Sequence, residues 1–249
     1  MIRLFKKKPN EAVKLPIYTD IHCHIVPGVD DGSPDTATSI ELLSRMKEWG
    51  LRRIYASPHV ADDVFENSPD TLDPALEELQ EAVKKTSLDM VIERHAEYRI
   101  GELSTRQIEQ GIATTLPKDY ILIENSFMQE PWDLENFVFN LKLKGLVPIL
   151  AHPERYRYYN STGSTGKQRY SELHHKGLLF QTNILSLAGQ YGSTDRETAE
   201  WLISMGFVDF LGTDLHNHRH ADTIEAYLRT NKARKHFDAL KGRLLNDTL

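Results

Sequence analysis

Four segments of the chain repeat one pattern of polar and apolar positions. In each, an amphipathic stretch ends at a glycine, and a short apolar run rich in Ile, Leu and Val follows. The glycines are Gly50, Gly145, Gly177 and Gly206. Glycine just past a helix adopts the left-handed backbone conformation at little cost. Short continuous apolar runs are typical of parallel strands that are buried on both faces. The pattern therefore predicts helices that alternate with buried parallel strands.

Seven apolar runs fit this description of a strand. They are predicted at residues 17–21, 53–56, 90–93, 120–124, 147–151, 178–182 and 208–212. Helices are predicted to begin near Ser33, with Pro34 at the first helical position, and near Asp73, Trp132 and Thr194. Seven alternating units within 249 residues predict an α/β fold, a distorted (β/α)7 TIM-like barrel. A doubly wound open sheet is the alternative.

No shift in composition divides the chain. Residues 1–249 are therefore predicted to form a single domain, with a basic N-terminal extension over residues 1–16. The lysines at positions 6–8 suit weak contact with an anionic membrane surface, although a solvated tail is the simpler interpretation. Residues 160–169, rich in Ser, Thr and Gly, are predicted to form a flexible loop.

Composition narrows the set of partners. A net charge of −6 without a basic face argues against a nucleic-acid partner. The single cysteine, Cys23, excludes a disulfide framework and fits a reducing compartment, so a cytoplasmic location is expected. No apolar run reaches the roughly 18 residues of a transmembrane helix. The oligomeric state stays open.

Histidines and carboxylates collect where the predicted strands end. In a parallel barrel, catalytic groups lie at the C-terminal ends of the strands. Six of the seven ends carry such a group, and only the sixth, at Gln181 and Asn183, does not. The candidates are His22, His24, Asp30, Asp31, His59, Glu97, Glu124, His152, Asp214 and His216. Their mutual repulsion and desolvation would be costly without cations, so the pattern predicts a metal site.

The ligand types indicate which metals and which substrate such a site takes. Imidazole with carboxylate suits Mn²⁺, Fe²⁺ or Zn²⁺, with Mg²⁺ as a further candidate, and the number of ligands predicts two to three divalent ions. Four carboxylates contribute −4 and three ions +6, and the net +2 favours a phosphate dianion. The four are Asp31, Glu97, Glu124 and Asp214. Arg155, three residues past His152, is the predicted phosphate ligand.

Cys23 suggests a different chemistry, that of a cysteine-dependent phosphatase. Such enzymes carry an arginine six residues after the cysteine, and this position is Val29. Alternate residues of a strand point to opposite sides, so Cys23 is predicted to face away from His22 and His24 and to pack as an apolar residue. The metal site is the preferred interpretation.

Several strings resemble the motif series of the polymerase-and-histidinol-phosphatase (PHP) superfamily. They are "DIHCHIVPGVDDG", "ASPH", "AEY", "YILIENS", "AHPERY" and "TDLHNH", and they extend over residues 19–236. Within the superfamily they resemble the bacterial metal-dependent protein-tyrosine phosphatases of capsule and exopolysaccharide operons. The resemblance implies a trinuclear site. One ion would be held by His22, His24, Glu97 and Asp214, a second by Glu97, Glu124 and His152, and a third by Asp31, His59 and His216.

The resemblance also implies a reaction and a partner. Phosphotyrosine would be hydrolysed by a metal-bridging hydroxide while Arg155 holds the phosphate. Arg219 is the nearest candidate for a second phosphate-binding arginine. Asp214 and His216 lie closest to the leaving phenolate, although both are also implied ligands. The implied substrate is a membrane-bound bacterial tyrosine autokinase that controls polysaccharide export.

Other functions stay open at this point. A histidinol-phosphate phosphatase, or another small-molecule phosphoesterase of the superfamily, would have almost the same ligands. Metal-dependent amide or lactone hydrolysis on a related barrel is a further alternative. The tyrosines that follow Arg155 (Tyr156, Tyr158 and Tyr159) would either flank a substrate ring or pack the next helix.

Overall fold

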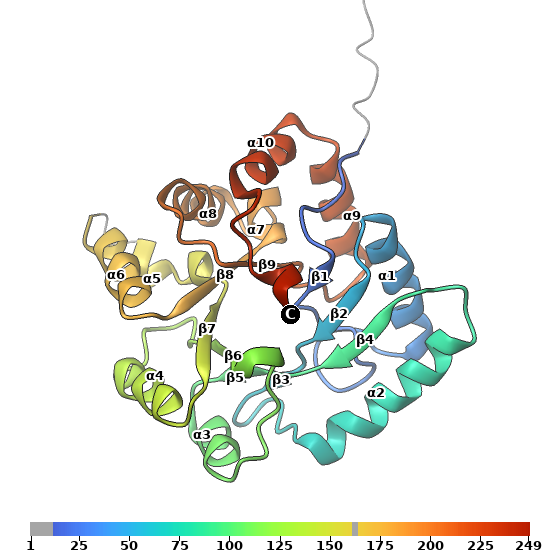
Figure 1. Ribbon diagram of the computed structural model, residues 1–249, viewed down its shortest axis with the longest axis horizontal. Coiled ribbons are helices and arrows are strands. Elements are labelled where there is room, and N and C mark those ends of the chain that lie inside the picture. Colours follow the sequence, from blue (N-terminus) through green and yellow to red (C-terminus); the bar gives the residue numbers. More distant parts are fainter. Residues whose placement is uncertain (1–11, 161–163) are drawn as a thin grey trace, which may run out of the picture.

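Parallel strands form two sheets in the computed structural model, which describes residues 12–160 and 164–249 (Figure 1). The first sheet has the order β1–β2–β4 and the second the order β3–β5–β6–β7–β8–β9. The strands of the first are β1 (Thr19–Asp20), β2 (Arg53–Ala56) and β4 (Val91–Arg94). Those of the second are β3 (His59–Val60), β5 (Glu97–Arg99), β6 (Tyr120–Glu124), β7 (Val147–Ala151), β8 (Leu179–Asn183) and β9 (Phe210–Gly212). Each of the seven predicted runs overlaps one of these strands, and β4 and β8 each extend one residue past the predicted end.

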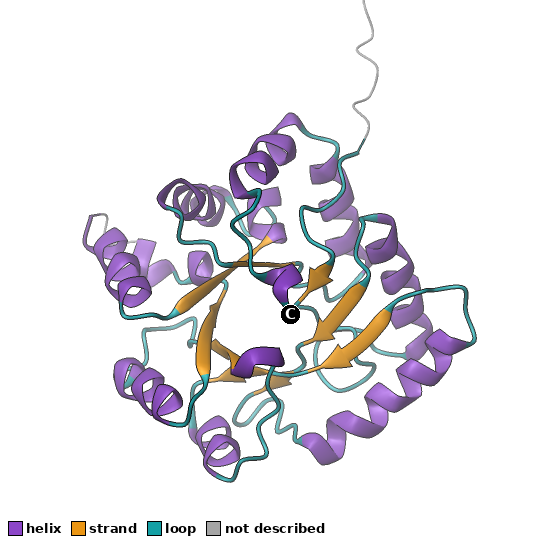
Figure 2. Ribbon diagram, in the orientation of Figure 1, coloured by secondary structure: helices purple, strands orange, loops and turns teal. Residues whose placement is uncertain are grey.

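The α-helices of the described residues lie outside the strands (Figure 2). They are α1 (Thr36–Glu48), α2 (Pro69–Lys84), α3 (Glu102–Glu109), α4 (Leu134–Leu143), α5 (Arg157–Asn160), α6 (Ser164–His175), α7 (Ile184–Ala188), α8 (Ser193–Met205), α9 (His218–Leu228) and α10 (Asn231–Leu240). Short 3₁₀ turns occur at Pro117–Asp119, Pro153–Arg155 and Asn246–Thr248. Parallel strands that alternate with helices confirm the α/β class.

Two helices begin elsewhere than predicted. Helix α1 starts at Thr36 because the side chain of Asp35, and not Ser33, accepts a hydrogen bond from the Thr38 N–H at 2.8 Å. Pro34 therefore precedes the helix. Helix α2 starts at Pro69, one residue after its N-cap Ser68, so Pro74 lies inside the helix and does not open it. An N-cap oxygen or an initial proline decides a helix start, and around α1 the sequence contains two possible N-cap residues, Ser33 and Asp35.

After a short interruption, two strands resume beyond the predicted runs, β2 as β3 and β4 as β5. Strands β2 and β4 pair Arg53 with Val91, and strands β3 and β5 pair His59 with Glu97. Both pairings have the same sequence offset, so the register continues across the break. The Glu97 N–H donates to the carbonyl of Pro58 at 3.1 Å, within the interruption. Proline has no N–H, which limits ladder pairing there.

The free edges of the two sheets meet beyond β1 and β9. Cys23 and Leu215 form an isolated parallel bridge. The His24 N–H donates to the Leu215 carbonyl at 2.9 Å, and the Asp214 N–H donates to the His22 carbonyl at 2.7 Å. These bonds place the segments after the first and last strands side by side, and both segments carry candidate ligands.

Apolar side chains pack on both sides of the strands. A large cluster lies between strands and helices, and a smaller one includes Ile21, Tyr55, Leu122, Ile149 and Phe210. Because side chains alternate along a strand, Leu122 shares its face with Glu124, two residues later on β6. On this strand the smaller cluster therefore packs on the face that carries a candidate ligand.

The four glycines predicted to end helices all have positive φ, from +72° at Gly206 to +110° at Gly50, which confirms that prediction. The predicted loop at 160–169 is wrong for its described part, because Ser164 and the residues after it belong to α6. Residues 161–163, and the lysines at 6–8, lie outside the described residues. Among the described residues, no helix has the length and apolarity to cross a membrane.

Candidate metal centre

The segment after β1 directs two histidines to one side and a cysteine to the other. His22 and His24 are fully buried and face each other, with ring centroids 5.5 Å apart. Cys23 is also fully buried, but it packs in the large apolar cluster, and burial raises the pKa of its thiol well above the usual value. The prediction that Cys23 faces away from the histidines is confirmed.

Four donor atoms from three parts of the chain form a first cluster. His22 Nε2 lies 3.3 Å from Glu97 Oε2 and 3.5 Å from Asp214 Oδ1. His24 Nε2 lies 3.5 Å and 3.6 Å from the same two oxygens. All four side chains are buried. The structure thus brings together His22, His24, Glu97 and Asp214, as the sequence resemblance implied.

A second cluster shares Glu97. His152 Nε2 lies 3.0 Å from Glu97 Oε1 and 3.7 Å from Glu124 Oε1. Burial raises the pKa of Glu124 to about 8, and the negative charge of Glu97 adds to the effect. A buried carboxyl group with so high a pKa is destabilised as an anion until a cation neutralises it.

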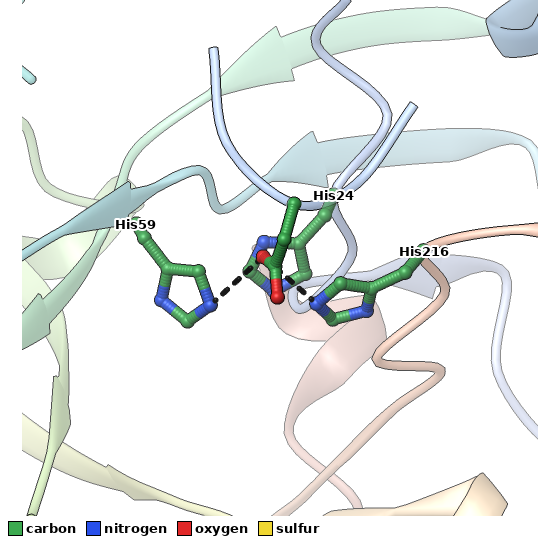
Figure 3. A group of neighbouring side chains, drawn as sticks. His24, His59 and His216 are labelled. Atoms are coloured by element: carbon green, nitrogen blue, oxygen red, sulfur yellow. Dashed lines mark ion pairs between the residues drawn. The ribbon is translucent and has the colours of Figure 1, made fainter. Parts of the chain in front are cut away.

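A third cluster lies nearer to solvent. Asp31 Oδ1 is 3.5 Å from His59 Nε2 and 3.6 Å from His216 Nε2. Figure 3 shows His59 and His216 on opposite sides of the carboxylate, with His24 behind it. Candidate ligand atoms of His24, Asp31, His59 and His216 all lie within 4.8 Å of one another. His59 also links this cluster to the others, since its Nδ1 is 3.2 Å from Glu97 Oε2.

The hydrogen bonds of these side chains fit metal ligands. His22 Nε2, His24 Nε2 and Glu97 Oε2 are buried and have no hydrogen-bond partner. The opposite ring nitrogens are held, His22 Nδ1 by Gln181 Oε1 at 2.6 Å and His24 Nδ1 by Asp30 Oδ2 at 2.8 Å. In a metal-bound histidine, one ring nitrogen typically donates to a protein oxygen, and the other is left for the metal. The donor set is therefore suited to divalent cations that accept nitrogen and oxygen ligands.

Two of the candidate ligands have strained backbones. His152 and Asp214 adopt positive φ angles of +32° and +52°, which residues other than glycine rarely do. Each follows a strand closely, His152 after β7 and Asp214 after β9. Strain of this kind costs about 1–3 kcal/mol and is common where side chains must point into a site.

A cavity of about 530 Å³ opens over the clusters, and Arg155 lines it. Arg155 Nη1 lies 3.0 Å from Asp214 Oδ2. Its guanidinium carbon lies 4.0 Å from the centroid of the Tyr191 ring and 4.8 Å from that of Phe127. A planar cation held between two rings and one carboxylate, with its remaining N–H groups toward a cavity, is suited to bind an oxyanion.

A family model for capsular polysaccharide synthesis, CpsB/CapC, matches residues 18–238. The chain belongs to this family. It is 33% identical over 202 residues to the tyrosine-protein phosphatase YwqE of Bacillus subtilis (strain 168), covering 80% of this chain and 77% of that one. It is 28% identical over 238 residues to the putative tyrosine-protein phosphatase CapC of Staphylococcus aureus, covering 92% and 89%.

A solved structure supports the same relationship. It comes from work on YwqE from Bacillus subtilis and CpsB from Streptococcus pneumoniae, described as unique metal-dependent tyrosine phosphatases. The TM-score is 0.73 and the identity 28%, over 91% of this chain and 95% of that one. The resemblance that the sequence motifs predicted is confirmed at the level of the CpsB/CapC family.

Some predicted residues of this CpsB/CapC family member do not reach the cavity. Arg219 lies exposed in the first turn of α9 and does not line the cavity. Tyr156 and Tyr159 are buried in the large apolar cluster and do not flank it. Tyr156 instead donates to the Ala151 carbonyl at 3.0 Å. Of the two alternatives for these tyrosines, packing is the one that the structure supports.

Other residues of the site were missed in the sequence. Gln181 and Asn183, where a strand ends without His or carboxylate, contact His22 and Asp214. Arg99, on β5, donates to Glu124 Oε2 at 3.0 Å and lines the cavity. The signal for Gln181 and Asn183 was available, since they occupy the same strand-end position as the ligands. No comparable signal distinguished Arg99 from a surface residue.

Proposed function

We propose that the chain is a metal-dependent protein-tyrosine phosphatase of the CpsB/CapC family. One observation carries the proposal. Eight buried or half-buried His, Asp and Glu side chains and the exposed Asp31 converge in three clusters, and Arg155 lies at the same cavity. The family membership and the named relatives, which are tyrosine-protein phosphatases, support the reaction class.

Three divalent ions are proposed, with Mn²⁺ preferred over Fe²⁺, Zn²⁺ and Mg²⁺. The ligand sets proposed are His22, His24, Glu97 and Asp214 for the first, Glu97, Glu124 and His152 for the second, and Asp31, His59 and His216 for the third. Bound there, divalent ions would supply a water of lowered pKa and stabilise negative charge on phosphoryl oxygens. The buried, partnerless nitrogens of His22 and His24 support the first set.

The side chains around the ions bind and orient the substrate. Arg155 holds the phosphate dianion, since Phe127 and Tyr191 fix the plane of its guanidinium and Asp214 anchors one N–H. Phe127 lines the cavity and is 40% exposed, so its ring is available to contact the phenyl ring of phosphotyrosine. Asp214 and His216, which lie at the cavity, act as ligands in this proposal, and proton delivery to the leaving phenolate is left to solvent. Arg219, which is exposed on α9 and is not among the residues that line the cavity, is not required for phosphate binding in this proposal.

We further propose that the two sheets act as one distorted (β/α)7 barrel. The unchanged register from the β2–β4 pair to the β3–β5 pair supports this, because each broken strand then counts once. The Cys23–Leu215 bridge supports closure between the first and last strands. Strand ends that meet at one opening bring ligands from six of the seven units to one cavity. The whole chain is proposed as one domain.

A protein substrate is preferred over a small phosphate ester. The loop that carries Phe127 continues into Met128 and Trp132, whose exposed fractions are 88% and 93%. These two residues line a second cavity of about 720 Å³. Exposed aromatic and methionine side chains beside a catalytic cavity suit a polypeptide that continues past the phosphotyrosine. Histidinol phosphate would leave this surface unused.

The partner proposed is a membrane-associated bacterial tyrosine autokinase that regulates capsular or exopolysaccharide synthesis. The family description, capsular polysaccharide synthesis, supports this setting. The proposed location is the cytoplasm, where the basic residues at positions 6–8 would favour weak contact with an anionic membrane.

The experiment compares phosphate release from a tyrosine-phosphorylated peptide and from histidinol phosphate. Both are assayed with Mn²⁺-loaded protein, with and without chelator. We expect turnover of the peptide that chelator abolishes and Mn²⁺ restores. Preference for histidinol phosphate would move the activity to the small-molecule branch, and no release from either ester by protein with bound metal would refute the proposed function.

A further inference from the structure

Two amide side chains, hydrogen-bonded to each other, connect two of the candidate ligands. Gln181 and Asn183 lie two residues apart on β8 and are fully buried, so both side chains point to the same side. Gln181 contacts the His22 ring, and Asn183 contacts the Asp214 carboxylate, at 2.6 Å each. Between them, the Gln181 Nε2 donates to Asn183 Oδ1 at 2.9 Å.

The acceptor character of Asp214 sets the direction of every hydrogen bond in this row, from Asp214 through Asn183 and Gln181 to His22. Asp214 Oδ2 also accepts from Arg155 Nη1 at 3.0 Å and from the Tyr191 hydroxyl at 3.1 Å, so it acts as an acceptor. The Asn183 atom that faces it must therefore be the NH₂ group. The oxygen of the Asn183 amide therefore faces Gln181 and accepts a hydrogen bond from the Gln181 NH₂ group. The Gln181 oxygen is left to face the His22 ring.

A second contact fixes the same orientation independently. The backbone N–H of His152, which can only donate, lies 3.3 Å from Gln181 Oε1. The bonds that begin at Asp214 and the His152 N–H thus both require the Gln181 oxygen to face the His22 ring. An amide oxygen can only accept a hydrogen bond. His22 Nδ1 must then carry the proton that it donates to Gln181. The lone pair of the neutral ring lies on Nε2, which faces Glu97 and Asp214.

The fold makes room for this contact at Gly212, on β9. A Cβ atom at Gly212 would lie 2.6 Å from both Gln181 Nε2 and His22 Cβ, which is closer than real Cβ atoms approach other atoms. Any other residue would therefore push β8 and the His22 segment apart. His24 differs from His22, since a carboxylate, Asp30, holds its Nδ1 directly at 2.8 Å.

We infer that Gln181 and Asn183 are positioning residues that fix His22 as the Nδ1–H tautomer and direct its Nε2 to the metal. His22 and Asp214, which the two amides connect, are both ligands of the first proposed ion. The amides therefore couple the orientation of the His22 ring to the position of the Asp214 carboxylate. This inference rests on the proposed metal centre and does not depend on which phosphate ester is hydrolysed.

The test is NMR of ¹⁵N-histidine-labelled, Zn²⁺-loaded protein, in which ring nitrogens report protonation directly. His22 is assigned by loss of its signals in His22→Asn. We expect an Nδ1–H signal for His22 protected from exchange with solvent. Gln181→Leu, which cannot accept a hydrogen bond, should lose the protection and weaken Zn²⁺ binding by about 10–100-fold.

A matched control lies on the same strand. Thr182, between the two amides, is fully buried and its hydroxyl has no hydrogen-bond partner. Thr182→Val should keep the His22 signal and bind Zn²⁺ within about twofold of the parent protein. Gln181→Glu keeps the shape and the acceptor, so it should keep the Nδ1–H signal even if Gln181→Leu does not fold.

Three results would overturn the inference. They are an Nε2–H signal for His22 in the Zn²⁺-loaded protein, an unchanged signal and affinity in folded Gln181→Leu, and loss of the signal in Gln181→Glu. A protein that shows the expected signals but hydrolyses no phosphopeptide would refute the proposed function and leave this inference standing.

Discussion

Arg155 and Asp214 form an ion pair, with Arg155 Nη1 3.0 Å from Asp214 Oδ2, and the pair connects the candidate phosphate ligand to a candidate metal ligand. The other oxygen of Asp214 faces His22 and His24. A single carboxylate therefore positions the arginine on one side and takes part in the first cluster on the other. Binding of metal and binding of phosphate should be coupled through this side chain.

Replacing Arg155 should reduce phosphate binding without removing the metal. Lysine keeps the charge but loses the planar fork and the stacking between Phe127 and Tyr191. Hydrogen bonds to charged groups contribute about 1.5–3 kcal/mol, so Arg155→Lys should lower kcat/KM for a phosphopeptide by about 10–100-fold. Steady-state kinetics with Mn²⁺-loaded protein and metal analysis of the same sample measure both effects.

The control for this prediction is Arg157→Lys, two residues along, whose side chain is 76% exposed and has no aromatic ring of the described residues stacked on it. It should stay within about twofold of the parent protein. An Arg155→Lys variant with the kinetics of Arg157→Lys would show that Arg155 does not hold the phosphate.

The metal-dependent rise in Tm should depend on Glu97. Its two oxygens lie within 3.0–3.5 Å of nitrogens of His22, His24, His59 and His152. A metal at 100 times its Kd adds about 2.7 kcal/mol, which corresponds to a rise in Tm of about 5–10 °C for a chain of this size. Glu97→Gln should lower the bound Mn²⁺ by at least one ion per chain and reduce the rise to under about 2 °C.

Glu93→Gln serves as the control for Glu97→Gln. Glu93 belongs to β4, just before the interruption, and makes a half-exposed ion pair with Arg53 at 2.8 Å. Calorimetry with and without chelator should show the full metal-dependent rise in Tm for Glu93→Gln. An equal rise in Glu97→Gln would remove Glu97 from the ligand set.

The sequence predicted the residues at strand ends, but not the residues that hold them in place. Strand-end positions are set by local patterning and by topology, so His22, Glu97 and Asp214 were identified before any distance was known. The identity of the partner behind each ligand depends on register between strands distant in sequence. Gln181 on β8 reaches His22 only because Gly212 on the strand between them has no side chain. No local pattern encodes that.

The strand interruptions show the same limit for the fold. Ala56 and His59 were assigned to the end of one strand and the loop after it, because Ser57 and Pro58 end the apolar run. Pairing with the neighbouring strand nevertheless resumes in register at His59 and Glu97. Tertiary pairing thus extends a strand past a residue that breaks the local pattern.

The buried carboxyl of Glu154 should make stability depend on pH. Burial raises its pKa from 4.5 to about 7, while its Oε1 accepts the Asn183 N–H at 2.9 Å. Between these two values the folded state holds a proton that the unfolded state has released. The free energy of unfolding should therefore fall as pH rises from about 4.5 to about 7, by up to about 3 kcal/mol, and change little from this source above pH 8.

Glu154→Gln isolates this contribution, because the amide keeps the acceptor for Asn183 and cannot ionise. Urea unfolding of both chelator-treated proteins at pH 5, 6, 7 and 8 gives the difference in their free energies of unfolding. The parent protein should lose stability relative to Glu154→Gln as pH rises through this range. Parallel pH profiles would show that Glu154 does not carry a raised pKa in the folded state.

Trp132 should affect protein substrates and leave small esters unaffected. Its side chain is 93% exposed and lines the 720 Å³ cavity beside the Phe127 loop, whereas the catalytic cavity is lined without it. Tryptophan is enriched among the interface residues whose truncation costs more than about 1 kcal/mol of binding, so Trp132→Ala should raise KM for a phosphopeptide by roughly 5–10-fold. Turnover of p-nitrophenyl phosphate, which has no polypeptide to contact Trp132, should not change. Phe139→Ala provides the comparison, since Phe139 is a 59% exposed aromatic residue on α4 that lines a different pocket. Equal effects of Trp132→Ala and Phe139→Ala on both substrates would mean that the surface around Trp132 does not contact the polypeptide, and that recognition is confined to the phosphotyrosine in the cavity.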